Sequence, residues 1–374
     1  MRFLHTADWH IGKQLRGRSR IAEQEQVVAE ILDITTRSKV DCVLFGGDLF
    51  DSHAPPPDAE RLVYNFFAEL IGRKIPAVVI AGNHDHPRRL AALRQMLDPA
   101  GIYIRSEPAR PSEGGVIDIK GVRIAMLPWI SEGRVVEAEK LLGPEDTWYA
   151  EYAENVARMV EILTEGADIL IGHLYVQCAQ ASGSERAIHI SQPYEISPHR
   201  FSPSLNYVAL GHLHRPQDIA APCRACYAGS PLQLDFGEQG QSKRVVLVET
   251  RRGKPAIVES VGLRSGRALR EINCTMPEIE TIAVGDDYLK VVVRTEGPEP
   301  GIADRVRKLL PNALSVTLEY ERRDAPNEQA TSTELSPEMW FDRYYRAEND
   351  GHLPAEALLK AFREVYDEVT RETR

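Results

Sequence analysis

Four short polar segments contain side chains that could do chemistry, and each follows an apolar run of the chain. They are Asp8-Trp9-His10, Gly46-Gly47-Asp48-Leu49-Phe50-Asp51, Gly82-Asn83-His84-Asp85 and Gly211-His212-Leu213-His214. A fifth segment, Gly172-His173, directly follows the sequence DILI. Together they offer histidine, carboxylate and amide groups without a thiolate. This donor set favours Mn²⁺, Fe²⁺ or Mg²⁺ over structural zinc.

The number of these side chains predicts two ions rather than one. The candidate ligands are Asp8, His10, Asp48, Asn83, His173, His212 and His214. They suit two octahedral ions that share a carboxylate and are completed by water. Such ions lie about 3.5–4 Å apart and contact both the attacking and the leaving oxygen of an in-line displacement. A single histidine or Gly-Asp pair is usually an ordinary turn residue, but five such segments in order indicate a metal site.

The elements that must position these side chains alternate between strand and helix. Residues 2–7, 41–46 and 76–81 are expected to be strands, and 21–36, 58–72 and 88–97 helices. This alternation predicts a largely parallel sheet covered by helices. Ligands at the carboxyl ends of such strands meet at one edge of the sheet, and the preceding glycines allow the sharp turns.

After residue 101 the pattern changes to shorter strands and a second sheet. The expected elements are strands at 116–119, 122–127, 168–172, 206–210, 225–228 and 244–249, with a helix across 149–164. The fold class is therefore α/β, and residues 1–265 should form a four-layer helix–sheet–sheet–helix sandwich. Residues 266–321 read as a small separate α/β domain, 322–334 as a polar linker, and 335–374 as a helical pair.

Composition restricts the class of protein. The net charge of −10 is unfavourable for binding DNA, because affinity for DNA comes mainly from Lys and Arg neutralising phosphates. Local basic groups beside the ligand segments could supply that contact, although they could equally be solvated surface charges. These groups are Lys13, Arg16, Arg18, Arg20, Arg88 and Arg89.

Targeting signals and disulfides are not expected. A His and an Asp interrupt the apolar run of MRFLHTADWH, so it does not resemble a signal peptide, and no run is long enough to span a bilayer. The five cysteines are scattered, which suits a reducing cytosol. Cys223 and Cys226 form a single CxxC, which is read as two ordinary thiols in preference to a zinc site.

The ordered motifs DxH, GGDxFD, GNHD, GH and GHLH resemble the calcineurin-like metallophosphoesterases. The sequence around these motifs is similar to that of the SbcD nucleases, the bacterial relatives of the meiotic recombination nuclease. It comprises LHTADWHIGK, GGDLFDSHAPP, ASGSERAI, YVALGHLHRPQ, YAGSPLQLDFGE and SKRVVLVE. These segments span residues 1 to about 250, and the C-terminal layout agrees more loosely.

The resemblance implies a division of the ligands. Asp8, His10, Asp48 and His214 would surround the first ion. Asp48, Asn83, His173 and His212 would surround the second, so that Asp48 bridges. His84 corresponds to the catalytic histidine of the family, which stabilises the transition state and protonates the leaving 3′ oxygen. It needs an orienting acceptor, for which Asp51 is the first choice and Asp85 the second; alternatively, Asp51 caps the next helix.

The resemblance also implies an activity and partners. It implies an Mn²⁺-dependent 3′–5′ exonuclease and endonuclease that acts on DNA ends and hairpins with an SbcC-type coiled-coil ABC ATPase in double-strand-break repair. Such a protein works in the cytoplasm at the nucleoid. Residues 266–321 would cover the DNA, and the chain would dimerise, with Phe66, Phe67 and Leu70 as a candidate face against a plainer role in the core. A stand-alone phosphatase or cyclic-nucleotide phosphodiesterase and a non-catalytic scaffold are the rival hypotheses.

The C-terminal segment carries aromatic and apolar residues at helical spacing. They are Trp340, Phe341, Tyr344 and Tyr345, then Leu358, Leu359, Phe362 and Tyr366. Two short helices could bury part of these faces against each other. Because the aromatic surface exceeds what such a pair can cover, the segment is predicted to dock on the ATPase.

Three further predictions concern polar residues outside the ligand set. His5 is expected to be a packed polar residue or a group behind the ligands. Glu185 and Arg186 match a segment of the family that could contact substrate or a neighbouring loop. His53, His86 and His189 are given no role.

Overall fold

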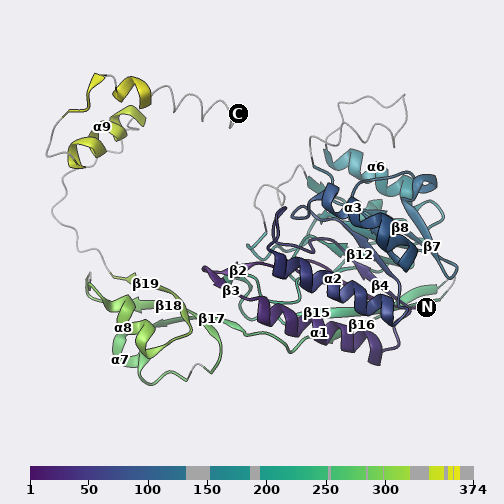
Figure 1. Ribbon diagram of the computed structural model, residues 1–374, viewed down its shortest axis with the longest axis horizontal. Coiled ribbons are helices and arrows are strands. Elements are labelled where there is room, and N and C mark those ends of the chain that lie inside the picture. The colour runs from purple at the N-terminus through teal and green to yellow at the C-terminus, as the bar shows by residue number, and fades with distance from the viewer. Residues whose placement is uncertain are drawn as a thin grey trace. The chain divides into compact units, whose positions relative to one another are not determined.

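The computed structural model describes residues 1–131, 152–185, 194–251, 254–283, 285–297, 299–320, 337–348, 353–356 and 358–362. It divides into two compact units, Met1–Tyr320 and Glu321–Arg374. Figure 1 identifies the elements of both units. The described residues do not include Arg186, His189, Ser336, Tyr366 or the linker 322–334. Within the described residues, no helix is long and apolar enough to cross a membrane.

A six-stranded mixed sheet carries the N-terminal motifs. Its order is β16 (Lys254–Gly262), β15 (Arg244–Arg251), β1 (Arg2–Thr6), β4 (Cys42–Phe45), β5 (Ala77–Ile80) and β6 (Ile102–Arg105). The strands β1, β4, β5 and β6 are parallel, while β15 runs antiparallel to both of its neighbours. The carboxyl ends of the parallel strands therefore share one edge.

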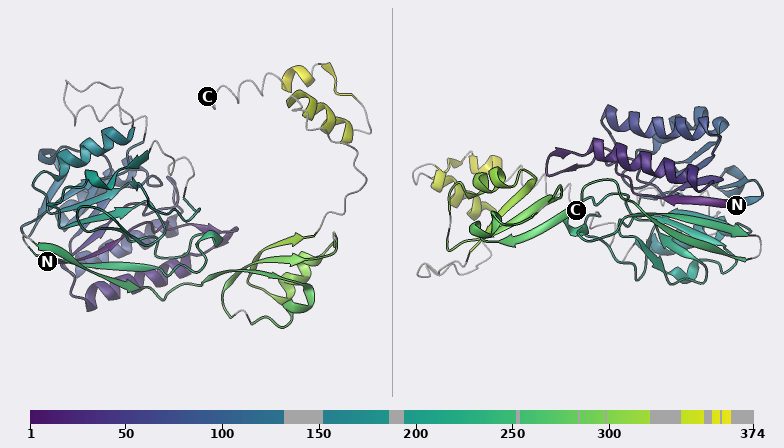
Figure 2. Two further views of the ribbon diagram at one scale, coloured as in Figure 1. Left: turned by 180° about the vertical axis from the view of Figure 1, so that it is seen from behind. Right: turned by 90° about the horizontal axis from the view of Figure 1, so that it is seen from below.

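A second six-stranded sheet completes the sandwich. Its order is β13 (Gln217–Ile219), β14 (Ala225–Tyr227), β12 (Tyr207–Gly211), β9 (Ile169–His173), β8 (Val122–Leu127) and β7 (Val116–Ile119). The first sheet is covered by side chains from α1 (Ile21–Arg37), α2 (Pro57–Gly72) and α3 (Pro87–Leu97), and the second by side chains from α6 (Tyr152–Thr164). Figure 2 shows the two sheets between their helical layers.

Alternation along the strands explains the four layers. In β1, Phe3 joins the core between the two sheets, whereas Leu4 joins the core beneath α1 and α2. Successive strand side chains point to opposite faces, so a strand that is apolar on both faces must be covered on both. The sequence-based fold class, an α/β sandwich of four layers in the order helix–sheet–sheet–helix, is confirmed.

Two strands of the first sheet were not expected from the sequence. They are β6, which adds a parallel edge, and β16, which pairs with β15 along most of its length. β6 is only four residues long, and the exposed side chains of β16 leave little apolar alternation. The other short elements are β2 (Gln14–Leu15), β3 (Arg18–Ser19), β10 (Tyr175–Val176), β11 (Glu195–Ile196) and the 3₁₀ turns Asp98–Ala100, Pro111–Glu113, Pro198–Arg200 and Phe236–Glu238.

Residues after the sandwich form a small module with its own core. It contains the parallel strands β17 (Leu269–Cys274), β18 (Tyr288–Arg294) and β19 (Ala313–Glu319), with α7 (Met276–Ile279) and α8 (Ile302–Leu309). Apolar side chains of both helices and all three strands pack into one separate cluster. Thr275 and Glu278 form a capping box at the start of α7.

In the second unit, α9 (Pro337–Glu348) divides its aromatic residues between two sides. Phe341 stacks on Phe362 of the next helical segment with ring centroids 4.4 Å apart, and it also lies beside Tyr345. Trp340 and Tyr344 are instead 59% and 65% exposed. The four aromatics therefore do not form one uncovered face: one pair packs inward, and the other faces solvent.

Candidate metal centre

The seven candidate ligands converge at one edge of the two sheets. Asp8 follows β1, Asp48 follows β4, and Asn83 follows β5; His173 ends β9, and the two histidines His212 and His214 follow β12. Six of the seven are at most 2% exposed, and Asn83 is 7% exposed. The two sheets meet here directly, because Nδ1 of His173 lies 2.8 Å from the carbonyl oxygen of Gly46.

The backbone at this edge adopts a conformation that side chains rarely accept. Asp8, His10, Asp48 and His212 have φ angles of 54°, 47°, 56° and 105°. Positive φ is uncommon outside glycine, and such residues cluster at functional sites, where the surrounding structure holds them. The strain aims four of the seven side chains at a common point, which favours a ligand site over ordinary turns.

Asp48 lies at the centre of the cluster. Its Oδ2 is 3.5 Å from Nε2 of His10 and 3.4 Å from Nε2 of His173. It belongs to two groups whose ligand atoms lie within 4.8 Å of one another: His10, Asp48 and His84, and Asp8, Asp48 and His173. A carboxylate shared by two such groups is therefore within reach of both sets of candidate ligands.

The remaining candidate ligands face the same space. Nε2 of His10 and Nε2 of His214 are 3.1 Å apart. The amide oxygen of Asn83 lies 2.9 Å from Nε2 of His173 and 3.1 Å from Nδ1 of His212. The chain thus places ring nitrogens next to one another and to oxygens, as a shared cation would require.

The buried groups fit divalent cations. Asp8 Oδ2 and His10 Nδ1 are buried without a hydrogen-bond partner among the described residues. Burial raises the pKa of Asp8 to about 7, and burial lowers that of His10 to about 4. The imidazole of His10 is thus held neutral, the form that ligates metals, and the buried carboxylate of Asp8 would be stabilised in its charged form by a cation.

Two glycines explain why the motifs contain that residue type. A Cβ atom on Gly82 would overlap Oδ1 of Asp48, and one on Gly47 would lie 2.5 Å from Nδ1 of His173. Gly47 also has a φ of 96°. Larger residues at either position would displace the central carboxylate or its histidine neighbour.

His84 stands beside the cluster, half-buried, and is held from two sides. Its backbone N–H donates to Oδ1 of Asp48 at 2.8 Å, and its Nδ1 lies 2.7 Å from the backbone carbonyl oxygen of Asp51. A carbonyl can only accept, so Nδ1 carries a proton. The ring of His84 packs edge-on against His10, with centroids 4.6 Å apart.

The group that orients His84 belongs to the expected residue, Asp51, but it is the backbone carbonyl and not the side chain. Asp51 is the residue that contacts the His84 ring, but it does so through its main chain, whereas its carboxylate lies 3.1 Å from Nζ of Lys13 and 3.4 Å from Nδ1 of His10. Asp85, the second choice, accepts the backbone N–H groups of Gly82, Leu49 and Phe50. It therefore joins two ligand loops.

Sequence reasoning missed a buried polar network behind His214. Nδ1 of His214 lies 2.6 Å from the Ser184 hydroxyl and 3.2 Å from Oε1 of Glu238. Glu238 is itself fully buried and paired with Lys243. Although burial opposes its ionisation, His214 and Lys243 lower the pKa of Glu238 to about 2. A carboxylate behind a histidine fixes which ring nitrogen faces a metal, and no spacing in the sequence links residues so far apart.

Two other residues have structural roles. His5 is fully buried, and its ring nitrogens bond Tyr207 and the carbonyl of Leu210, so its role is packing. Glu185 accepts the backbone N–H groups of Ser182 and His214, which ties the loop before it to the ligand segment.

One of the basic side chains expected to contact DNA is not on the surface. Arg20 is 3% exposed and donates to Glu23 and to the carbonyl of Gln233, so its guanidinium supports the core. The expectation that it contacts DNA is therefore wrong, because its guanidinium is buried and paired with Glu23. Arg89 forms an ion pair with Glu60, and Lys13 one with Asp51; Arg16, Arg18 and Arg88 are exposed.

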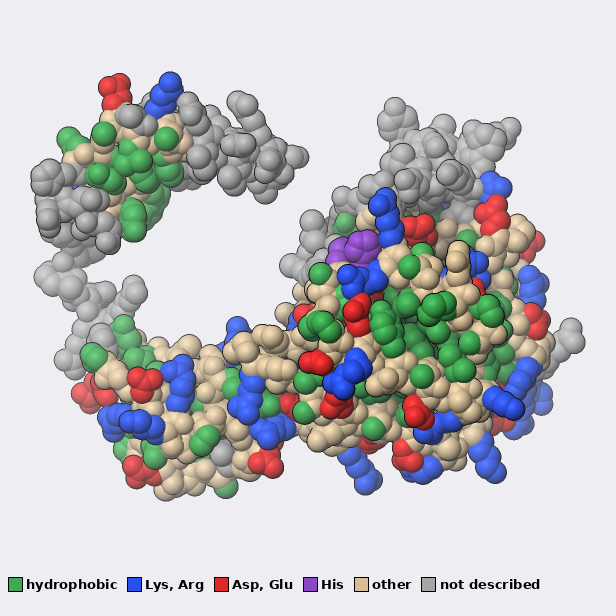
Figure 3. Space-filling view, viewed as in Figure 1, with side chains coloured by type: hydrophobic (Ala, Val, Ile, Leu, Met, Phe, Trp, Pro, Cys, Tyr) green, Lys and Arg blue, Asp and Glu red, His purple; other side chains and the backbone are tan. Residues whose placement is uncertain are grey.

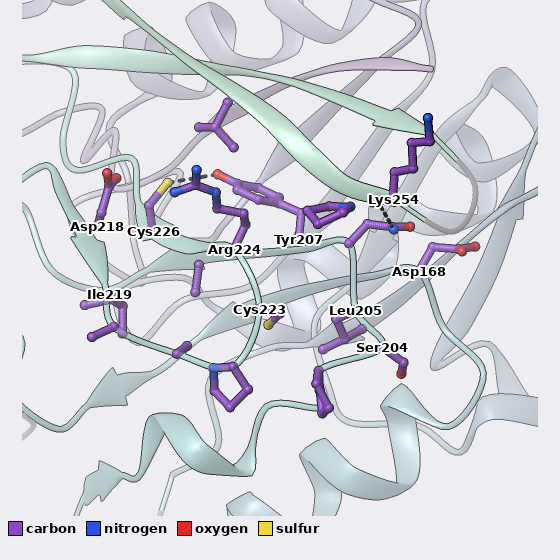
Figure 4. A pocket seen from close by; sticks show the side chains of 18 of the residues that line it. Asp168, Ser204, Leu205, Tyr207, Asp218, Ile219, Cys223, Arg224, Cys226 and Lys254 are labelled. Atoms are coloured by element: carbon purple, nitrogen blue, oxygen red, sulfur yellow. Dashed lines mark hydrogen bonds between the residues drawn. The ribbon is translucent and has the colours of Figure 1, made fainter.

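A cavity of about 830 Å³ lies at the strand ends opposite to the candidate metal centre. The CxxC residues Cys223 and Cys226 line it (Figure 4). Cys226 is buried, with its sulfur 2.9 Å from the hydroxyl of Tyr207. Burial raises the pKa of both Cys223 and Cys226 to about 11. Neither belongs to a potential metal-ligand group among the described residues.

Several known families and proteins are similar to this chain. The family described as calcineurin-like phosphoesterase matches residues 1–216, and one described as type 5 capsule protein repressor C-terminal domain matches residues 265–349. The SbcD component of the nuclease SbcCD from Bacillus subtilis (strain 168) is 33% identical over 396 aligned residues, covering 100% of this chain and 99% of that protein. The protein of the same name from Rhodobacter capsulatus is 33% identical over 67% of this chain and 66% of its own length. A dimetal phosphatase from Danio rerio aligns with a TM-score of 0.43 at 15% identity, over 70% of this chain and 96% of its own.

The sandwich and its buried His/Asp cluster define a metallophosphoesterase, a hydrolytic enzyme that uses divalent metal. Within that class, the full-length similarity is specific: the chain belongs to the calcineurin-like phosphoesterases and, among them, to the SbcD nuclease family.

Proposed function

We propose that the protein is an Mn²⁺-dependent DNA nuclease, a 3′–5′ exonuclease and hairpin endonuclease that binds two ions per chain, with Mg²⁺ or Fe²⁺ as alternatives. The observation that carries the proposal is the position of Asp48, which belongs to both groups of potential ligand atoms while its Oδ1 accepts from the backbone of His84. The curated relatives are named as nucleases. Asp8, His10, Asp48 and His214 would hold one ion, and Asp48, Asn83, His173 and His212 the other.

When bound, the ions would supply positive charge at the phosphoryl group and favour deprotonation of an attacking water. The protein's own contribution centres on His84. Because Nδ1–H is committed to the Asp51 carbonyl, His84 would act as a general acid in its doubly protonated form, with the second proton on Nε2. Nε2 would deliver that proton to the leaving 3′ oxygen, and the ring would be left neutral with its proton on Nδ1. The bond from phosphorus to that oxygen breaks as the bond to the water oxygen forms, so the leaving group departs as a neutral hydroxyl.

A stand-alone phosphatase is the rival that the same centre could support. Two assays separate them. Purified protein with Mn²⁺ should hydrolyse bis-p-nitrophenyl phosphate, a diester, and hardly attack p-nitrophenyl phosphate, and it should cut a labelled DNA hairpin. A strong preference for the mono-ester, with no hairpin cleavage, would favour the phosphatase.

DNA contact would fall to basic side chains near the centre. Lys13, Arg16, Arg18, Arg88 and Arg89 remain proposed contacts, and the module spanning β17 to β19 is proposed to cover bound DNA. The module is attached to the sandwich beside this basic segment, since Arg18 lies over the ring of Tyr288 at 5.2 Å.

The exposed apolar side chains of the C-terminal unit support the proposal that it binds a partner protein. Trp340, Tyr344, Met339, Leu353 and Leu358 are all at least 40% exposed, and together they form the tail surface. Large exposed apolar side chains gathered in a small unit indicate a binding face. The occupant we propose is an SbcC-type ABC ATPase, a choice supported by the name of the relatives, which are one part of a complex. Such a complex would act in DNA repair in the cytoplasm, at the nucleoid.

A different surface leads us to propose that the chain forms a homodimer. Two chains with two ATPase subunits would then make a heterotetramer. Figure 3 shows apolar side chains gathered over α2 and α3, where Met96 is 71% exposed. Phe66, Phe67 and Leu70 are buried and therefore belong to the core. Light scattering should show that the unaltered protein is a dimer and that Met96→Glu weakens this dimer. The control Ile257→Glu, at another exposed residue, should leave the dimer intact. An unaltered protein that is monomeric would refute the proposed homodimer.

A further inference from the structure

A cavity of about 470 Å³ opens directly beside the candidate metal centre. Its wall includes His53, Asn83, His86, Arg88, Ser106 and Trp129. Asn83 is one of the seven candidate ligands, so the cavity and the cluster share a side chain. Its volume falls within the range of small-molecule binding sites, about 300–1,000 Å³.

Ser106 is the residue that most needs an explanation. It follows β6, at the same sheet edge as the ligands, and it is 8% exposed. Its hydroxyl lines the cavity and forms no hydrogen bond with any of the residues that the structure describes. The side chain is thus nearly buried, while its hydroxyl stays open to the cavity and is not used by the protein itself. A polar group placed in this way beside a reaction centre can bind a ligand there.

The cationic side of the cavity comes from the start of α3. Arg88 lies in the first turn of this eleven-residue helix, is exposed, and has no carboxylate partner among the described residues. By contrast, its neighbour Arg89 pairs with Glu60, and Arg94 farther along the helix pairs with Asp98. The positive end of the helix dipole adds to the charge of Arg88.

Two histidines add further N–H donors. The rings of His53 and His86 form a T-shaped contact with centroids 5.6 Å apart, and both residues are exposed. Among the described residues, Asp85 is the acidic side chain in the wall, and it is 1% exposed. Both of its carboxylate oxygens accept backbone N–H groups, three in all, so they are occupied within the protein.

Trp129 adds an aromatic surface to the wall of the cavity. Its ring stacks on His212 with centroids 5.0 Å apart and on Tyr194 with centroids 5.6 Å apart. These contacts hold the indole in place beside a candidate ligand. Donors and a flat apolar surface in one cavity match a nucleotide, which has an anionic phosphate and an apolar sugar face.

We propose that this cavity is a subsite for the DNA strand being cut, in which Arg88 and the Ser106 hydroxyl bind the phosphate next to the scissile one. The proposal rests on the proposed nuclease function and deepens it, because it names how the enzyme recognises a strand and not only a diester. His53 and His86 donate to the same phosphate or its sugar, and Trp129 supports the sugar. The reaction would thus favour substrates with a charged neighbour on that side.

The test removes the charge of one phosphate at a time. Oligonucleotides carrying a neutral methylphosphonate on the 5′ or the 3′ side of the cut are compared with the unmodified strand. In the unaltered protein, one of the two replacements should raise KM about tenfold, the usual range for losing a hydrogen bond to a charged group, with kcat nearly unchanged. Arg88→Ala should raise KM for the unmodified strand, and the methylphosphonate that impairs the unaltered protein should then have no further effect. Arg94→Ala, a matched arginine of the same helix, should behave like the unaltered protein.

Ser106→Ala gives a readout that does not depend on turnover. Since the hydroxyl has no partner among the described residues of the free protein, its removal should leave Tm unchanged or raised, yet weaken the Kd of a phosphorylated trinucleotide measured in EDTA. The proposal is overturned if Arg88→Ala responds to both methylphosphonates as the unaltered protein does, or if Ser106→Ala binds the trinucleotide with full affinity. Bis-p-nitrophenyl phosphate has no neighbouring phosphate, so its hydrolysis reports separately on the proposed nuclease chemistry.

Discussion

The carboxylate of Asp48 is the side chain on which the metal assignment depends. It is buried and lies within 3.5 Å of two histidine nitrogens. If it contacts both ions, Asp48→Ala should lose nearly all bound metal, while His10→Ala should lose about one ion per chain. Elemental analysis of the purified proteins decides this, with Asp33→Ala, an exposed helix residue, as the control. Two ions retained in the Asp48 variant would rule out bridging.

His84 is distinguished from the ligands by what its loss should leave intact. His84→Ala is expected to keep both ions and to bind DNA normally, but to cut it about 10²–10⁴-fold more slowly, the usual effect of losing a general acid. Metal content, DNA affinity and single-turnover cleavage are measured on the same preparation. Because His84 also falls in one group of potential ligand atoms, an inactive variant that had lost an ion would make it a ligand.

At the scale of elements, a buried contact attaches the small module to the sandwich. The hydroxyl of Tyr288 in β18 donates to Glu23 of α1 at 2.8 Å, and Glu23 also accepts the backbone N–H of Arg267. The Tyr288 ring lies under the guanidinium groups of Arg18 and Arg267, at 5.2 and 5.1 Å. Glu23 is thus a common acceptor for both domains.

Removing that one hydroxyl should loosen the attachment without altering the metal centre. Tyr288→Phe loses a hydrogen bond to a charged acceptor, which is worth about 1.5 kcal/mol. We expect β18 amides to exchange with deuterium about tenfold faster, with hydrolysis of bis-p-nitrophenyl phosphate unchanged. Tyr103→Phe is the control, because the Tyr103 hydroxyl forms no hydrogen bond with the residues that the structure describes. Unchanged exchange in β18 would mean that the attachment lies elsewhere.

At the scale of the whole molecule, the two compact units should have separable roles. A chain ending at Asn327 is expected to retain Mn²⁺-dependent diesterase activity, because the whole metal cluster lies within Met1–Tyr320. It should no longer co-purify with the ATPase or respond to ATP. Trp340→Ala with Tyr344→Ala should give the same loss in the full chain, since both side chains are exposed. Unfolding of the shortened chain, or full ATPase affinity in either variant, would contradict this division.

The sequence by itself determined the class of fold and the identity of the residues at the centre. Local signals suffice for this: short apolar runs predict the strands, helical periodicity predicts α1, α2 and α6, and the glycines before Asp48, Asn83 and His212 mark where turns begin. Because parallel strands end at one edge, polar residues after each strand could be grouped before any distance was known. The short strand β6 and the exposed strand β16 lacked such a signal.

Only the tertiary structure decided which atoms meet. It showed that His84 contacts the main chain of Asp51, that Arg20 is buried against Glu23, and that Glu238 stands behind His214. It also divided the tail aromatics into a packed pair and an exposed pair. Each of these depends on side-chain direction between segments far apart in the chain, and residue type and spacing do not encode that direction, because packing and burial select among conformations that are equally allowed locally.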